Sequence, residues 1–290
     1  MEVRRVTTTE EAVAALGELG DDAQILAGGT DVMLQLQRGE IHPEMLIPIE
    51  HLKDLAALSN NGTVRIGTLV THETLAHDVL GPGFDSIRES AATVGGWQTQ
   101  AVGTIGGNVC NASPAADTLP ALLVHGAQVG LTSTAGERTI ALGDFLKGRR
   151  QTERRADELL THIDLEQPPP KSGDTYLKVG RRGAMEVAIV GLAMRLSFDD
   201  EGVIRQARVA LASVAPIPFR SSAAESVLQG SRPDASAAAS AAEALLEEIS
   251  PIDDLRASAR YRRLLIPGLT ARATAQCADR AGIATFAEGG

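Results

Sequence analysis

A run of prolines divides this chain and constrains its fold more than any other feature. Pro168, Pro169 and Pro170 stand between Gln167 and Lys171-Ser172-Gly173. A proline lacks the backbone N–H that a helix or a sheet ladder needs, so neither element continues through the run. The chain has 290 residues, of which 43% are hydrophobic, and it can bury a sizeable core. We therefore expect two compact domains that meet at this run.

The charge balance excludes several classes of partner. The chain has 27 Lys and Arg against 37 Asp and Glu, a formal net charge of −10, which has the wrong sign for gripping nucleic acid or anionic lipid. No stretch approaches about 18 unbroken apolar residues, and the first residues lack the apolar segment of a signal peptide. We expect a soluble, cytoplasmic chain with no nucleic acid partner and no membrane insertion.

Metal ligands are not grouped along the chain. Cys110 and Cys277 are the only cysteines and lie far apart, without the short spacing of zinc or iron–sulfur ligands. His72 and His77 do not share a helix face as a metal pair would, and neither carries a functional argument. Aromatic residues make up only 3% of the chain, so a flat cofactor would be held mainly by backbone and aliphatic contacts.

The first 170 residues alternate short helices and strands. Thr8 and Glu11 have capping-box spacing, so we expect a helix over residues 8–20 that ends at Gly20. Residues 30–39 show strand-like alternation, but their polar start and terminal glycine favour a helix. The remaining expected elements are strands at 24–27, 45–49, 64–70 and 158–165, a helical turn within 51–58, a helix from Ser86 to Gly95-Gly96, another helix after Asp117, and a hairpin of 128–131 with 138–141.

The chain after the prolines has a simpler pattern. Three apolar segments, Thr175–Val179, Val187–Phe198 and Val203–Ala212, predict a small antiparallel sheet. Three Ala-rich amphipathic segments follow, roughly 221–229, 234–249 and 253–281, and they would cover one face of the sheet. The second domain is therefore expected to be α+β.

Two glycine pairs carry the chemistry. Gly28-Gly29 and Gly106-Gly107 each follow an apolar segment, and glycine lets backbone N–H groups approach phosphate oxygens without a Cβ in the way. Thr30, Thr104 and Asn108 could complete such a cradle with hydroxyl or amide groups. The two pairs suggest a pyrophosphate site, although each alone could be only a tight turn. Neither fits the Rossmann or the P-loop fingerprint.

The residues around these pairs resemble a known family. Leu26-Ala-Gly-Gly-Thr-Asp31, Gly103-Thr-Ile-Gly-Gly-Asn108 and Ala112-Ser-Pro-Ala-Ala-Asp117 look like the FAD-binding motifs of the flavoprotein subunits of molybdenum hydroxylases. That group includes the medium subunit of carbon monoxide dehydrogenase and the flavin domain of xanthine dehydrogenase.

The resemblance implies an α+β fold of the vanillyl-alcohol-oxidase (PCMH) type. Residues 1–170 would form the FAD-binding domain, with subdomains of about 1–55 and 56–170. Residues 175–284 would form a C-terminal domain like that of carbon monoxide dehydrogenase flavoproteins, with a three-stranded antiparallel sheet and helices.

The same resemblance implies the cofactor-binding residues. Ala27 to Asp31 and Thr104 to Asn108 would bind the pyrophosphate and ribityl parts of FAD. Asp117 would accept hydrogen bonds from the cofactor, although it could also cap the helix that follows. Lys178 would be a cation near the flavin, or else an exposed strand lysine. The full expected set is Leu26, Ala27, Gly28, Gly29, Thr30, Asp31, Val94, Thr104, Ile105, Gly106, Gly107, Asn108, Asp117, Leu160 and Lys178.

The function implied is that of an electron-transfer oxidoreductase subunit. It would accept electrons from the [2Fe–2S] clusters of a small partner subunit and pass them to an external acceptor, with the molybdopterin cofactor in a large subunit. A dimer of such heterotrimers is what the family suggests, and no side chain of this chain is expected to be catalytic. The alternatives are a free-standing FAD-dependent oxidoreductase and a non-catalytic scaffold subunit. The sequence leaves the organic substrate and the electron acceptor open.

Overall fold

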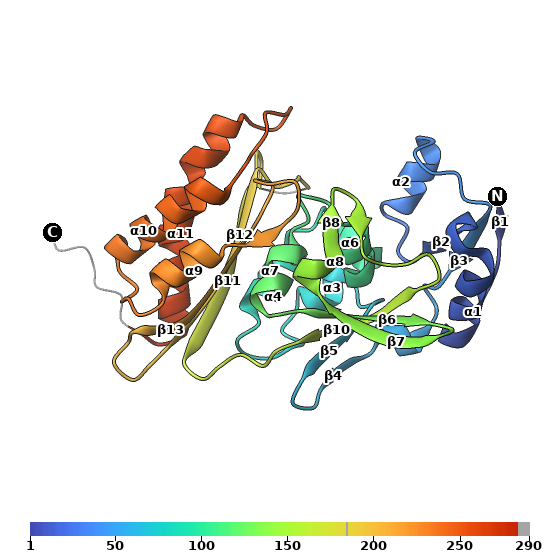
Figure 1. Ribbon diagram of the computed structural model, residues 1–290, viewed down its shortest axis with the longest axis horizontal. Coiled ribbons are helices and arrows are strands. Elements are labelled where there is room, and N and C mark those ends of the chain that lie inside the picture. Colours follow the sequence, from blue (N-terminus) through green and yellow to red (C-terminus); the bar gives the residue numbers. More distant parts are fainter. Residues whose placement is uncertain (184, 284–290) are drawn as a thin grey trace.

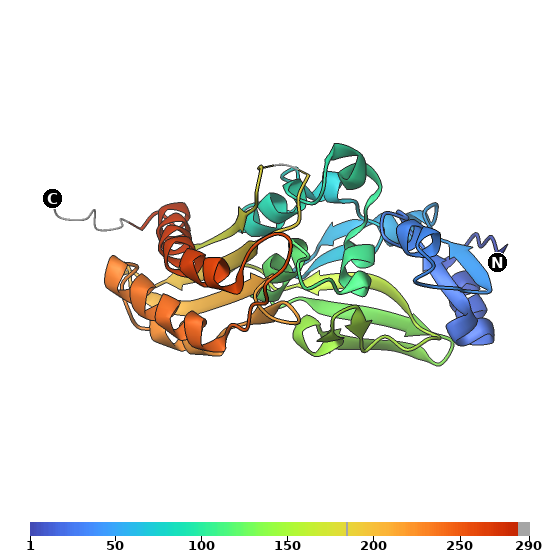
Figure 2. The ribbon, with the colours of Figure 1, turned by 90° about the horizontal axis from the view of Figure 1, so that it is seen from above.

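The computed structural model describes residues 1–183 and 185–283 as an elongated molecule. The N-terminal residues lie at one end, a five-stranded sheet lies in the middle, and the C-terminal helices lie at the other end (Figure 1). The view from above shows the same order along the long axis (Figure 2).

The N-terminal part is a three-stranded parallel sheet with helices beside it. The strands are β1 (Glu2–Val3), β3 (Met45–Pro48) and β2 (Ala23–Leu26), in that order across the sheet. The helices are α1 (Thr9–Leu19), a 3-10 turn at Gly20–Asp22, and α2 (Val32–Gln37). Thr8 caps α1 by accepting a bond from the N–H of Glu11, as its spacing predicts. The choice of a helix for the ambiguous segment after Gly29 is confirmed by α2.

The middle part is built on an antiparallel sheet. Its five strands have the order β4 (Leu58–Asn60), β5 (Val64–Gly67), β10 (Leu159–Leu165), β6 (Gln128–Ser133) and β7 (Gly136–Ala141). The other elements are a 3-10 turn at Lys53–Ala56, α3 (His72–Leu75), α4 (Asp85–Ala92), α5 (Trp97–Val102), α6 (Ile105–Asn111), α7 (Thr118–Val124), α8 (Leu142–Phe145), and the small hairpin of β8 (Leu146–Gly148) with β9 (Gln151–Thr152).

The C-terminal part is an antiparallel sheet covered on its outer face by helices (Figure 1). The strands follow one another in chain order: β11 (Ser172–Val179), β12 (Val190–Phe198), β13 (Ile204–Ala212) and the short edge strand β14 (Phe219–Arg220). The helices are α9 (Ser222–Leu228), α10 (Ala235–Glu248) and α11 (Ala259–Arg280). The expected three strands and three helices are present, and β14 adds a fourth strand.

Element boundaries are where the sequence expectations differ from the structure. The last helix begins at Ala259 and not at residue 253, because Ser258 caps it and Asp254 accepts bonds from the N–H groups of Arg256 and Ala257 in a preceding turn. The helix expected to run to Gly95 ends at Ala92. Helix α5 and the hairpin of β8 with β9 were not expected from the sequence.

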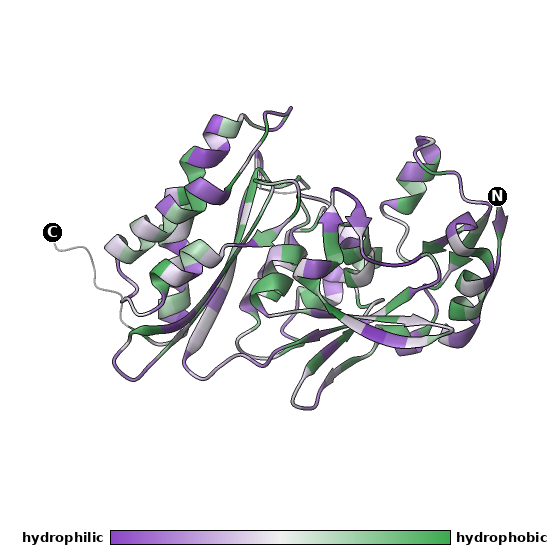
Figure 3. Cartoon of the chain, in the orientation of Figure 1, coloured by the Kyte–Doolittle hydropathy of each residue, from purple (hydrophilic) through white to green (hydrophobic). Residues whose placement is uncertain are grey.

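Helix α7 fills the space between the middle and the C-terminal parts. All of its residues are buried, and it is mostly green in Figure 3. Its core cluster also contains Tyr176, Ala193 and Ala210 from the C-terminal sheet. Leu192 and Met194, the neighbours of Ala193 on β12, belong to the cluster under the outer helices. The sheet is thus hydrophobic on both faces, which explains why β12 reads as a continuous apolar run.

A buried polar network ties these two parts together. Asp174 on β11 is 1% exposed, and it accepts bonds from the N–H of Ser86 at 2.7 Å and from His125 Nε2 at 3.0 Å. Arg195 lies 3.3 Å from the other ring nitrogen of His125. Because arginine can only donate, the proton of a neutral His125 belongs on Nε2, towards Asp174. Burial acts to raise the pKa of Asp174, but the bonds from His125 and Ser86 outweigh it and hold that pKa below its usual value.

We expect Asp174→Ala to lower the free energy of unfolding by about 3 kcal/mol, because it leaves buried donors of Ser86 and His125 without an acceptor. Asp164→Ala is the matched control, since Asp164 pairs with a half-exposed Arg65 and its loss should cost less than about 1 kcal/mol. Urea denaturation followed by circular dichroism measures both. Equal losses in the two variants would show that the network does not hold the parts together.

Candidate functional site

One cavity lies where the three parts of the chain meet. Its volume is about 630 Å³, within the usual 300–1,000 Å³ of a small-molecule or cofactor site. The β2–α2 turn forms one wall, and the start of α6 with the loop after it forms another. Residues 185–187, which precede β12, and Leu159 and Leu160 on β10 also line it.

Most of the residues expected at the site line this cavity. They are Ala27, Gly28, Gly29, Thr30, Asp31, Val94, Thr104, Gly106, Gly107, Asn108, Asp117 and Leu160. Leu26, Ile105 and Lys178 are not part of the lining. Leu26 ends β2, Ile105 is fully buried in the core beneath α6, and Lys178 stands behind Asp117.

Gly28 and Gly106 are needed for contacts within the protein. A Cβ on Gly28 would lie 1.7 Å from the carbonyl oxygen of Val102, and a Cβ on Gly106 would lie 1.6 Å from Oγ1 of Thr68. Both distances are far below van der Waals contact. The first glycine pair therefore packs directly against the end of α5, and the second packs against the end of β5. The absence of a side chain at Gly28 lets the first motif approach the second, and its absence at Gly106 lets α6 approach the end of β5.

The first glycine turn presents unused backbone donors. The carbonyls of Gly29 and Asp31 accept bonds from Met33 and Gln35 as α2 begins. The N–H groups of residues 28–31, by contrast, have no recorded acceptor anywhere in residues 1–183 and 185–283. Gly29 has a φ of 71°, which turns the backbone at the middle of this run. Consecutive free N–H groups on a cavity wall form a concave site for an anion such as a phosphate.

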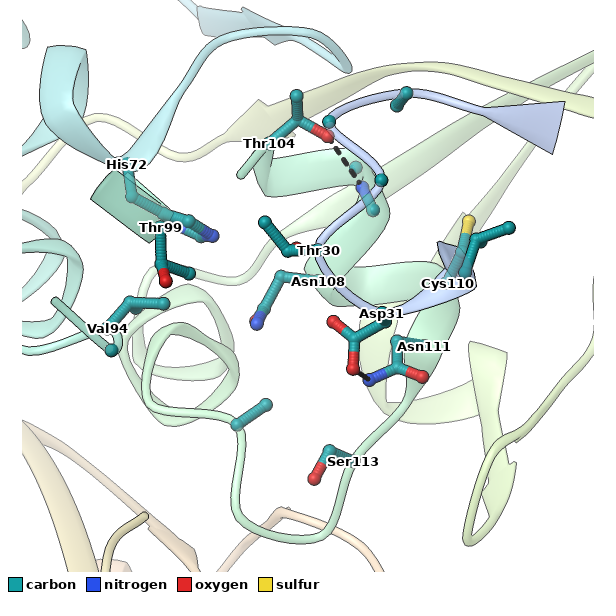
Figure 4. A pocket seen from close by; sticks show the side chains of 18 of the residues that line it. Thr30, Asp31, His72, Val94, Thr99, Thr104, Asn108, Cys110, Asn111 and Ser113 are labelled. Carbon is teal, nitrogen blue, oxygen red and sulfur yellow. Dashed lines mark hydrogen bonds between the residues drawn. The ribbon is translucent and has the colours of Figure 1, made fainter. Parts of the chain in front are cut away.

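The second glycine turn uses its N–H groups internally. Those of Ile105 and Gly106 donate to Val70 and Thr68, and those of Gly107 and Asn108 donate to the hydroxyl and the carbonyl of Thr104. This differs from the expectation that both turns offer backbone donors. Asn108 accepts a bond from Thr118 at its side-chain oxygen, and its side-chain nitrogen points into the open cavity (Figure 4). The side chain of Asn108 is therefore the group that this turn can present to a ligand.

Asp31 joins the two sides of the cavity. Its carboxylate accepts a bond from the side chain of Asn111, at the end of α6, at 3.0 Å (Figure 4). Burial raises the pKa of Asp31, and Arg150 and Asn111 oppose that rise.

Asp117 and Lys178 form a buried ion pair. Their charged atoms are 2.8 Å apart, and the side chains are 7% and 8% exposed. Lys178 also donates to the carbonyls of Thr93 and Glu186, and Tyr176 donates to the other oxygen of Asp117 at 2.6 Å. Burial raises the pKa of Asp117, and Lys178 opposes the rise.

This arrangement removes two of the alternatives raised by the sequence. Asp117 does not cap α7 with its side chain, and Lys178 is not an exposed strand lysine. All three protons of the Lys178 ammonium group have acceptors in the protein. Lys178 therefore holds Asp117 and the residues beside the cavity in place.

His72 lines the cavity and was not expected from the sequence. It is 2% exposed, its Nδ1 has no hydrogen-bond partner, and burial lowers its pKa to about 4. A lone histidine after a strand carries no pattern that marks it. Arg150, Arg154 and Cys110 also line the cavity without having been expected, and they come from the β8–β9 hairpin region and from α6.

Neither a metal-binding group nor a membrane-spanning helix is present in residues 1–183 and 185–283. No group of three or more His, Cys, Asp or Glu side chains in residues 1–183 and 185–283 is placed to bind a metal ion. Within those same residues, none of the helices combines the length and the apolar character needed to cross a bilayer.

Comparison with known families gives two matches along the chain. Residues 1–168 match the family described as the FAD binding domain in molybdopterin dehydrogenase. Residues 175–277 match the CO dehydrogenase flavoprotein C-terminal domain.

Individual proteins resemble the chain over nearly all of its length. The carbon monoxide dehydrogenase medium chain of Afipia carboxidovorans is 33% identical over 282 residues, which are 96% of each chain. The xanthine dehydrogenase FAD-binding subunit of Escherichia coli O157:H7 is 28% identical over the same share of each chain. A chain of the cyanide-inactivated Cu,Mo-CO dehydrogenase structure has a TM-score of 0.92 and 30% identity, covering 97% of this chain and 98% of that one. The α+β fold expected from the sequence is confirmed.

We expect Gly106→Ala to lower the free energy of unfolding by at least about 3 kcal/mol, because the new Cβ collides with the backbone oxygen and the side chain of Thr68. Gly268→Ala in α11 is the control, since nothing lies within 4 Å of its Cβ. It should be neutral or stabilising by about 0.5–1 kcal/mol. Urea denaturation of both variants tests this, and similar stabilities would contradict the close packing of the second turn.

We expect Lys178→Met to lower the free energy of unfolding by about 3–5 kcal/mol, because it leaves the carboxylate of Asp117 buried without a counter-charge. Lys171→Met is the control, since Lys171 is half exposed and pairs with an exposed Asp200, an interaction of less than about 1 kcal/mol. Thermal and urea denaturation measure the difference. If the two variants lose the same stability, the buried pair has no special role.

Proposed function

Because the chain belongs to the family of FAD-binding subunits of molybdenum hydroxylases, we propose that it is an electron-transfer subunit whose FAD connects the [2Fe–2S] clusters of a partner subunit with an external electron acceptor. The family is the one predicted from the two glycine motifs. The chain is thus an oxidoreductase subunit. FAD supplies the redox chemistry, since it can exchange electrons one at a time or in pairs.

The observation that carries this proposal is the run of unpaired N–H groups over residues 28–31 on a cavity wall. Residues 28–31 are half-buried, and their free N–H groups on a cavity wall can bind an anion. The pyrophosphate of FAD has the required charge and oxygens. Thr30, Thr104 and Asn108 line the same part of the cavity and add side-chain groups.

The rest of the lining has the character that the remainder of FAD requires. Val94 and Leu160 offer apolar surface for the flavin or the adenine ring. Asp117 keeps unused lone pairs on its two oxygens and can accept a bond from a cofactor N–H group. Lys178 positions Asp117 through their ion pair. Leu26 and Ile105 support the cavity wall without lining it. In this proposal no side chain of the chain works as a nucleophile or as a general base.

Exposed apolar side chains beside the cavity support an assembly with other subunits. Trp97 at the start of α5 is 72% exposed, and Val102, Met185 and Val187 are at least half exposed. Met185 and Val187 line the cavity, and the backbone carbonyl of Val102 packs against Gly28. Large apolar side chains exposed beside a cavity are candidates for burial by a partner. We propose that a small iron–sulfur subunit and a large molybdopterin subunit assemble with this chain, as a dimer of heterotrimers.

We expect the full chain, purified alone, to bind FAD and to release it intact on mild denaturation. Visible absorption of the folded chain and mass spectrometry of the released ligand measure this. When the chain is purified with its partners, iron and molybdenum should be present, and chemically reduced iron–sulfur subunit should bleach the flavin absorption.

Two outcomes would contradict the proposal. A folded chain that takes up no FAD, alone or with its partners, would favour a scaffold role. An isolated chain that oxidises an organic substrate with sustained turnover would favour a free-standing oxidoreductase.

A further inference from the structure

The position of His72 is set by the second FAD motif. The N–H of His72 donates to the carbonyl of Gly103 at 3.0 Å, and Thr71 forms an isolated antiparallel β-bridge with Thr104. The imidazole packs on the bare face of Gly103, where a Cβ would lie 3.1 Å from Cδ2 and 3.7 Å from Nε2 of the ring. A Cβ at residue 103 would also lie only 2.7 Å from the carbonyl oxygen of Thr99, so the packing at this position requires glycine. The motif therefore helps to position His72 at the cavity.

The two ring nitrogens of His72 are in different surroundings. Nδ1 is enclosed by protein and has no hydrogen-bond partner. No hydrogen bond to either ring nitrogen is recorded within residues 1–183 and 185–283. Burial lowers the pKa of His72 to about 4, so the ring is neutral near pH 7 and carries one proton. That proton is best placed on Nε2, because an N–H at the enclosed Nδ1 would have no acceptor.

The imidazole faces the first glycine turn across the cavity. Figure 4 shows its ring pointing from one wall towards Thr30 on the other, with Thr99 beside it. Thr30 belongs to the turn whose N–H groups are unpaired. An anion held by residues 28–31 would therefore have the ring of His72 on its opposite side.

We propose that His72 is a further cofactor-contact residue, which donates a hydrogen bond from Nε2 to a pyrophosphate oxygen of FAD opposite residues 28–31. The inference rests on the FAD site of the proposed function and extends it to a residue outside both glycine motifs. The neutral ring adds a hydrogen-bond donor on the side of the cavity formed by the second turn. The backbone N–H groups of that turn already donate to acceptors within the protein.

The first test is FAD binding by the deflavinated full chain, measured by fluorescence titration. His72→Leu should raise the Kd for FAD by about 10-fold to 100-fold, the effect of losing a hydrogen bond to a charged group. His72→Gln places an amide N–H near the position of Nε2 and should stay within about threefold of the wild type. His77→Leu is the matched control, because His77 is exposed just beyond α3, and it should leave the Kd unchanged.

The second test reads the contact itself in the FAD-loaded chain. The ³¹P resonances of the bound pyrophosphate should shift between the wild type and His72→Gln, and should not shift in His77→Leu. In the ¹⁵N-histidine-labelled wild type, FAD should move the Nε2–H signal of His72 and leave Nδ1 unprotonated. Because this measurement uses the wild-type chain, it does not depend on whether His72→Leu folds.

The outcomes separate the two proposals. A wild-type chain that takes up no FAD overturns both. A wild-type chain that binds FAD overturns only the role of His72 if His72→Leu binds equally well, or if the His72 signals do not respond to FAD. An affinity loss without any change in the ³¹P resonances overturns the assignment to the pyrophosphate.

Discussion

The close approach of two distant backbone segments underlies the site. Gly28 packs against the carbonyl of Val102, and Gly106 packs against Thr68, at distances that leave no room for a Cβ. A side chain at either glycine would keep these main chains apart. Because the backbones touch, a cavity forms between the β2–α2 turn and the start of α6. Glycine is thus required here first for packing and only then for access to a ligand.

The two turns then divide the work of binding. The second turn satisfies its own N–H groups and becomes a rigid start of α6. The first turn leaves its N–H groups unpaired and so is the part that can bind an anion. The C-terminal sheet closes the other end of the cavity through the buried Asp117–Lys178 pair. Each member of the pair neutralises a charge that would otherwise be buried alone. The network around Asp174 and His125 fixes that sheet against α4 and α7.

Much of the fold could be predicted from the sequence, because local rules and packing agree in most elements. Thr8 with Glu11 marked α1, and the apolar runs marked β11, β12 and β13. The predictions were wrong at boundaries such as the start of α11, where Asp254 stabilises a turn that periodicity does not reveal. Helix α5 was missed because its residues show no amphipathic pattern, and none of them is buried.

From the sequence alone came the two glycine motifs, the family and the prediction of a domain boundary at the prolines, since each depends on residue types at particular positions in the chain. The tertiary structure decided how the residues are used. It showed that Lys178 donates its three hydrogen bonds to Thr93, Asp117 and Glu186. It also showed that the N–H groups after Thr104 have acceptors within the protein. It also placed His72 on the cavity wall. Spacing along the chain cannot reveal such facts, because a hydrogen bond depends on which donors and acceptors folding brings together and on which of them it shields from water.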